Sequence, residues 1–127
     1  MINDLLKAIY AEGLFAVPLS MPNRTFNTSG MDMWGKWQLM PTSTYRGNLR
    51  DIERAGILQI TLFVPIGTDD TLIDDKAKAI AAHFGTEKAH MVDGHNVLIM
   101  SSHIEPAMPD SDGKWYMTPI SIEYEII

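Results

Sequence analysis

The sequence predicts an α+β fold in which a mainly antiparallel sheet has two helices packed on one face. Apolar residues recur at helical spacing in two segments, Ile2–Ile9 and Ile73–Phe84. Four segments are typical of strands: Trp34–Pro41, Ile57–Val64, Val97–Ile104 and Trp115–Ile126. The order is therefore helix, strand, strand, helix, strand, strand, and its hairpin-like junctions favour antiparallel neighbours with the helices gathered on one face.

The first helix and the first strand have recognisable limits. Asn3 or Asp4 can cap the helix, and Gly13 can end it. The strand Trp34–Pro41 stops at its own proline. The polar segment 42–55 follows, and Gly47-Asn48 within it is the expected turn of a hairpin.

The segment Ile57–Val64 is the strongest strand of the chain. Leu58, Ile60, Leu62 and Val64 share one face, and the opposite face is also largely apolar. Apolar residues on both faces indicate a central strand, or one whose second face is covered by a partner.

The second helix follows this strand after a Pro–Gly turn. Thr68 or Asp69 is the expected N-cap, and Gly85 is the expected stop. The buried side is predicted from helical spacing to contain Ile73, Ala77, Ile80, Ala81 and Phe84.

The last strand, Trp115–Ile126, alternates apolar and polar residues with a clean period of two. Pro119 interrupts the alternation, which predicts an edge position or a bulge because proline cannot donate a backbone hydrogen bond.

Composition limits the classes of function. We interpret residues 1–127 as a single domain. The absence of cysteine excludes disulfides, zinc–thiolate sites and thiol catalysis. A net charge of -6 makes general affinity for nucleic acid unexpected. No apolar run approaches the roughly 20 residues that span a bilayer, so no membrane partner is expected.

The histidines raise the question of a metal centre. His90 and His95 flank Asp93, and these residue types can bind zinc. The spacing matches no known ligand motif, and Asp93-Gly94 is a strong turn pair for a hairpin. We predict no enzyme, no catalytic residue, no metal and no cofactor. A small metal-dependent hydrolase or a ligand-binding domain is the alternative.

Candidate interface residues fall into three groups. Trp34 stands beside a loop of small polar residues, and aromatic residues at loop edges often anchor interfaces. Arg46, Arg50 and Arg54 recur at intervals of four, either as a basic patch or as a solvated segment. Asp110 and Asp112 lie in an acidic loop with Glu105, where either paired carboxylates or simple solvation would suit them.

Three stretches carry a resemblance to a known family. They are Trp37–Pro41, Ala55–Gly67 with the alanine-rich helix that ends in Ala82-His83-Phe84, and Gly113–Tyr124. Together they resemble the tail terminator family of long-tailed bacteriophages, also described as minor tail or tail-completion proteins. The resemblance covers residues 34–127, and the first helix matches in kind.

This resemblance implies a virion protein that assembles in the host cytoplasm. It would cap the tail tube, end tube polymerisation and join the tail to the head, as a hexameric ring. The implied partners are the tail tube protein, a head-completion or connector protein, and further copies of the chain. DNA would pass through as a non-sticking cargo, which suits an acidic channel. Another head–tail connector protein is the neighbouring alternative.

Overall fold

The computed structural model describes residues 2–21, 27–28, 30–41 and 55–126. Helix α1 spans Ile2–Glu12, and helix α2 spans Asp70–Phe84. The strands are β1 (Leu19–Ser20), β2 (Trp34–Pro41), β3 (Ala55–Pro65), β4 (Lys88–Val92), β5 (His95–Ile104), β6 (Met108–Pro109) and β7 (Trp115–Ile126). No helix of this described part has the length and apolar character needed to cross a membrane.

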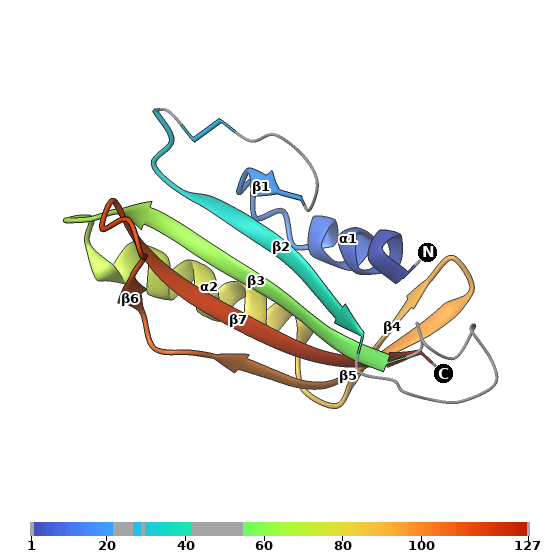
Figure 1. Ribbon diagram of the computed structural model, residues 1–127. Coiled ribbons are helices and arrows are strands. Elements are labelled where there is room, and N and C mark those ends of the chain that lie inside the picture. The colour runs from blue at the N-terminus through green and yellow to red at the C-terminus, as the bar shows by residue number, and fades with distance from the viewer. Residues whose placement is uncertain (1, 22–26, 29, 42–54, 127) are drawn as a thin grey trace.

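The strands form one sheet in the order β1-β2-β3-β7-β5-β4, and β6 pairs with the first part of β7 (Figure 1). Every pair is antiparallel except β1–β2. The predicted α+β class with a mainly antiparallel sheet is therefore confirmed. Strands β1, β4 and β6 were not predicted. Two residues are too few to show alternation, and β4 begins with the polar, weakly strand-forming sequence Lys88-Ala89-His90.

Strand β3 lies at the centre of the sheet, as its two apolar faces predicted. It pairs with β2 on one side and with β7 on the other. From Ala55 to Leu62 its residues alternate between half-buried and buried, and Phe63 and Val64 are buried as well. Leu58, Ile60 and Leu62 are fully buried. The half-buried set explains why the second face also appeared apolar in the sequence.

Both helices contribute to the core that contains these residues. Leu5, Leu6 and Ile9 of α1 are buried in it. The buried residues of α2 are Ile73, Ala77, Ile80 and Phe84, while Ala81 is partly buried, in agreement with the predicted helical stripe. Burial of such side chains stabilises each by roughly 1.5–3 kcal/mol relative to exposure.

The ends of α2 are set by local chemistry. The Asp69 carboxylate accepts a hydrogen bond from the backbone N–H of Thr71 at 3.0 Å. At the other end, Gly85 adopts a positive φ of 82° and its N–H donates to the Ala81 carbonyl. Both predicted helix limits are confirmed.

The N-cap predicted at Asn3 or Asp4 is wrong, because both residues lie inside α1. Helix α1 already begins at Ile2, so Asn3 lies inside its first turn. Its Oδ1 accepts a hydrogen bond of 2.6 Å from Nε1 of Trp37, a β2 residue whose side chain is 1% exposed. The side chain therefore satisfies a buried indole N–H of the sheet, which local sequence could not reveal.

The edge position or bulge predicted at Pro119 is also wrong, because β7 lies between β3 and β5 and its register with β3 passes through Pro119 without a shift. The carbonyl of Pro119 accepts a hydrogen bond from Glu105 N, just beyond the end of β5. In an antiparallel strand the N and C=O of one residue point to the same side. The missing N–H of Pro119 therefore faces the point where β5 ends, and the β3 ladder loses nothing.

The hairpin predicted at Asp93-Gly94 is confirmed. It joins β4 to β5, and both turn residues have positive φ values, 50° and 79°. Such a pair is typical of the tight turns that match strand twist. The turn predicted at Gly47-Asn48 lies outside the described residues.

The Asn3–Trp37 hydrogen bond predicts a specific loss of stability. Asn3→Ala would leave a buried indole N–H without an acceptor, so we expect the free energy of unfolding to fall by about 1–3 kcal/mol. Urea denaturation, followed by tryptophan fluorescence, measures this free energy of unfolding. Asp4→Asn, an exposed change in the same turn, should stay within about 0.5 kcal/mol. Equal stability of the two variants would contradict the assigned role.

The Asp69 cap predicts a dependence on pH. Hydrogen bonds from Thr71, first from its backbone N–H and then from its side chain, lower the pKa of Asp69. A lowered folded-state pKa contributes stability that is complete above the unfolded value of about 4 and is lost as pH falls through the folded value. The melting temperature of Asp69→Ala should lie below that of wild type at pH 7, and the difference should shrink below about pH 4. A difference that is constant with pH would contradict the cap.

Candidate protein interface

Trp34 is packed into an aromatic cluster at one end of the sheet. It is the first residue of β2 and is half-buried. Its ring stacks on Phe63 with a centroid distance of 4.1 Å and an interplanar angle of 8°. Trp115 meets the same ring edge-on at 5.7 Å. We call Trp34, Phe63 and Trp115 the aromatic end of the sheet.

Two methionines extend the aromatic end across the sheet. Phe63 is the register partner of both Trp34 in β2 and Met117 in β7, and Met117 is also paired with Met108 in β6. Register partners lie side by side on one face. The row passes from buried Phe63 to Met108, which is 42% exposed. An apolar strip thus reaches solvent at this end, and methionine suits surfaces that must adapt to a partner.

The acidic loop is tied to the aromatic end. Backbone N of Asp110 donates to the Trp115 carbonyl at 2.8 Å, and Trp115 N donates to Asp110 Oδ1 at 3.4 Å. Trp34 and Asp110, which were proposed separately from the sequence, therefore both contact Trp115. Asp112 is exposed in the turn that follows. Asp110 shapes the loop, whereas Asp112 presents its charge to solvent.

Arg46, Arg50 and Arg54 lie outside the described residues. The described flanks of their segment are Pro41, which ends β2, and Ala55, which begins β3, so the segment starts at the opposite end of β2 from Trp34. Every arginine of the chain falls outside the described part, where lysine supplies the fixed positive charge among many more carboxylates. The chain is thus acidic over its described framework and has its arginines in the remaining segments.

Of the three residues considered for a metal site, His90, Asp93 and His95, His90 contacts the backbone. His90 Nε2 lies 3.0 Å from the carbonyl of Phe84, the last residue of α2. Asp93 is exposed in the β4–β5 turn, and His95 begins β5. Within the described ranges, no group of three or more His, Asp or Glu side chains is placed to hold a metal ion.

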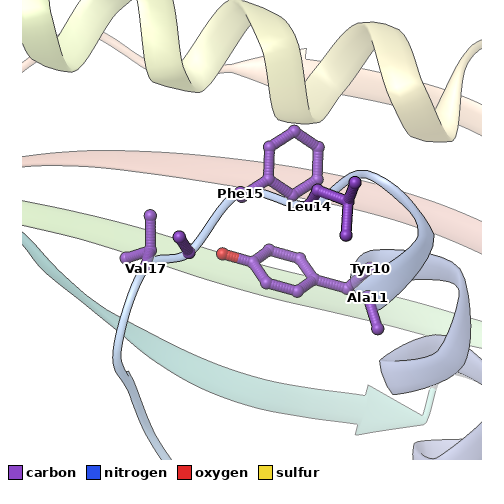
Figure 2. Close-up of a pocket in the computed structure, with 6 residues that line it drawn as sticks. Tyr10, Ala11, Leu14, Phe15 and Val17 are labelled. Atoms are coloured by element: carbon purple, nitrogen blue, oxygen red, sulfur yellow. The ribbon is translucent and has the colours of Figure 1, made fainter.

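The sequence did not predict an apolar pocket beside the end of α1. It has a volume of about 390 Å³ and is lined by Tyr10, Ala11, Leu14, Phe15, Ala16 and Val17 (Figure 2). Tyr10 is 7% exposed, and burial raises the pKa of its hydroxyl to about 12. The apolar pair Leu14-Phe15 directly after the helix stop Gly13 was the available signal, because such a pair is unusual in a solvated loop.

A second cavity of about 410 Å³ lies between the segment before β2 and the start of α2. Its lining includes Asp32, Met33, Leu72 and Lys76. Leu72 is 59% exposed there, so this cavity also has an apolar rim. Lys76 Nζ donates to the Phe15 carbonyl at 3.0 Å and so connects the rims of the two cavities.

Comparison with known proteins begins with the fold. Two solved chains match this one. One of them has a TM-score of 0.71 and 19% sequence identity, and the match covers 98% of this chain and 95% of that one. At this identity the likeness shows that the fold is shared. A search of curated proteins finds no match.

Family comparison supplies the assignment that geometry alone does not. The sequence model of the phage tail terminator protein family matches residues 1–124, which is almost the whole chain and includes the first helix. The resemblance inferred from the strand motifs is thereby confirmed. The chain therefore belongs to the phage tail terminator protein family and is a structural protein of the virion tail.

Proposed function

We propose that this chain caps the phage tail tube, ends tube polymerisation and forms the surface that joins the tail to the head. The observation that carries the proposal is the family match over residues 1–124. We place its assembly in the host cytoplasm, with residues 1–127 acting as one domain.

The working form is a closed hexameric ring. A ring needs heterologous contacts, in which two different surfaces of each subunit meet. We infer that both helices pack on one face of the sheet, since they share a core with alternate residues of β3. The opposite face, which carries the row from Trp34 to Met108, is then left for contacts.

The proposed contact residues are Trp34, Arg46, Arg50, Arg54, Asp110 and Asp112. In the sequence, the arginines follow the end of β2 whereas Trp34 begins it, and we infer that the two groups serve unlike surfaces. Arginine pairs with carboxylates through two parallel hydrogen bonds, so an acidic framework with arginine-bearing segments is suited to meet its own copies or a tail protein.

Tube polymerisation would end because this protein occupies the end of the tube. One side of the ring binds the last ring of tube protein, and the other presents no surface to which another tube subunit can add. That second side receives the head-completion or connector protein. Glu105, Asp110 and Asp112 would face the channel, where carboxylates repel the phosphates of passing DNA.

Reversing two arginine charges tests the basic patch. We expect Arg50→Glu with Arg54→Glu to give tails of uncontrolled length and low infectivity, because like charges would then meet at the contact. Electron microscopy of tail lengths and plaque titres measure the effect. The monomer should keep its melting temperature. The charge-preserving control, Arg50→Lys with Arg54→Lys, should retain most of the activity, and wild-type tails in the glutamate variant would refute the patch.

Asp112 allows a separate test of the channel. Asp112→Lys changes an exposed charge, whereas Asp110 also holds the loop. We expect a lower infectious titre per assembled tail, because lysine attracts DNA phosphates. Asp75→Lys makes the same charge change on the exposed side of α2 and is the control. Equal titres for the two variants would place Asp112 outside the channel.

A further inference from the structure

The loop after α1 holds its residues in an unusual conformation. Leu14 and Ala16 have positive φ values of 52° and 54°, a region that residues other than glycine seldom adopt. Phe15 between them is 8% exposed, and its ring centroid lies 5.0 Å from that of Tyr10 and 5.6 Å from that of His83. The loop therefore turns Phe15 inward and Leu14 outward.

Leu14 is the most exposed large apolar side chain of the described chain, at 87%. It stands at the rim of the pocket lined by residues 10–11 and 14–17, and the Lys76–Phe15 hydrogen bond fixes the loop beneath it. In the isolated subunit, a strained backbone that holds an apolar side chain in water raises the free energy of the folded state without a compensating gain. Such strain is found chiefly at functional sites.

Tyr10 supplies a second and independent sign of a missing partner. Its hydroxyl is buried and has no hydrogen-bond partner among the described residues. Figure 2 shows this hydroxyl pointing along the pocket toward Val17. A suitable occupant would bring an apolar side chain for the pocket together with a backbone carbonyl for the hydroxyl, as the strained loop shifts to admit it.

One segment of the same chain meets both requirements. Met91 of β4 is 65% exposed, the second highest value among the large apolar side chains that the structure describes. Strand β4 is the last strand in the sheet order, and within the described ranges it pairs only with β5, so no second strand uses the carbonyls of its outer edge. Helix α1 also packs against β4. Met91 is flexible enough to fill an irregular pocket. Charges are complementary as well: Asp93 lies two residues after Met91, and the Lys76 ammonium group contacts the carbonyl of Phe15, which lines the pocket.

We propose that the pocket formed by Tyr10 and residues 14–17 receives Met91 and the edge of β4 from a second copy of this chain. The inference rests on the proposed ring, for which it names one pair of unlike surfaces. Because the pocket and the hairpin are different patches, repetition of the contact closes a ring or extends a chain rather than stopping at a two-fold dimer.

Cysteine crosslinking tests the contact directly. The chain has no cysteine, so every disulfide of the variant Leu14→Cys with Met91→Cys joins the engineered positions, and the single variants reveal any disulfide between like positions. Tails carrying the double variant are oxidised mildly and run on a non-reducing gel. We expect a ladder of linked subunits up to the closed ring. Leu14→Cys with Leu72→Cys, which uses another exposed leucine, and each single variant should give none.

The results separate the contact from the function. Tails of normal length without a ladder would overturn the contact and leave the proposed function standing. A dimer formed by Leu14→Cys alone would show a two-fold contact and would also overturn it. Full ladders on tails of uncontrolled length would support the contact and count against capping.

If the cysteine variant does not enter tails, self-association of the purified chain is measured instead. Sedimentation should show association weakened at least tenfold by Leu14→Asp and by Met91→Asp, and unchanged by Leu72→Asp. Tyr10→Phe should raise the melting temperature of the monomer and weaken association roughly two- to tenfold. If the Tyr10 hydroxyl had a purely structural role, Tyr10→Phe would change the melting temperature and leave association unchanged. Equal association of all variants, or a wild type that stays monomeric at millimolar concentration, would overturn the inference.

Discussion

The pairing of β3 with β7 is the constraint on which the rest of the molecule depends. Every residue of β3, from Ala55 to Pro65, has a register partner in β7. Within this pair, Leu58 meets Ile122 and Ile60 meets Ile120, and all four are fully buried in the core that also contains apolar residues of both helices. A slip of one residue would move these side chains to the opposite face and expose them. The aromatic end has the same origin, since Phe63 and Trp115 belong to these two strands.

Several energetically costly features lie together in one loop, and the buried Thr118 hydroxyl of β7 is a further polar group without a hydrogen-bond partner among the described residues. Each non-glycine residue held at positive φ costs about 1–2 kcal/mol, and a buried hydroxyl without a partner costs about 1–3 kcal/mol. Leu14, Ala16 and Tyr10 together carry three such costs within seven residues of chain. The burial of β3 and β7 is large enough to tolerate them, so the fold can hold a strained surface ready for a partner.

The arginines are also unevenly distributed along the sequence. Carboxylates are spread over the helices and turns that the structure describes, and all arginines belong to the segments at 22–26 and 42–54. Segment 42–54 also contains Asp51 and Glu53, so the separation concerns the position of arginine along the sequence. Complementary charges across an interface favour the correct partner and disfavour contacts between like charges. For a protein of the tail terminator family, a subunit with unlike surfaces is consistent with a ring that closes on itself.

The sequence by itself determined α2, β2, β3, β5 and β7 closely, because periodicity, caps and prolines act within a few residues of chain. The strand motifs also identified the family, which the match over residues 1–124 confirms. Only the tertiary structure decided which strand lies beside the backbone nitrogen of Pro119. It also decided that Asn3 accepts a hydrogen bond from Trp37, and that Trp34 and Asp110 both contact Trp115. The Tyr10 pocket likewise exists only once a loop folds back on its helix. Each of these features depends on a partner distant in sequence, and that partner is fixed by sheet order rather than by local preference.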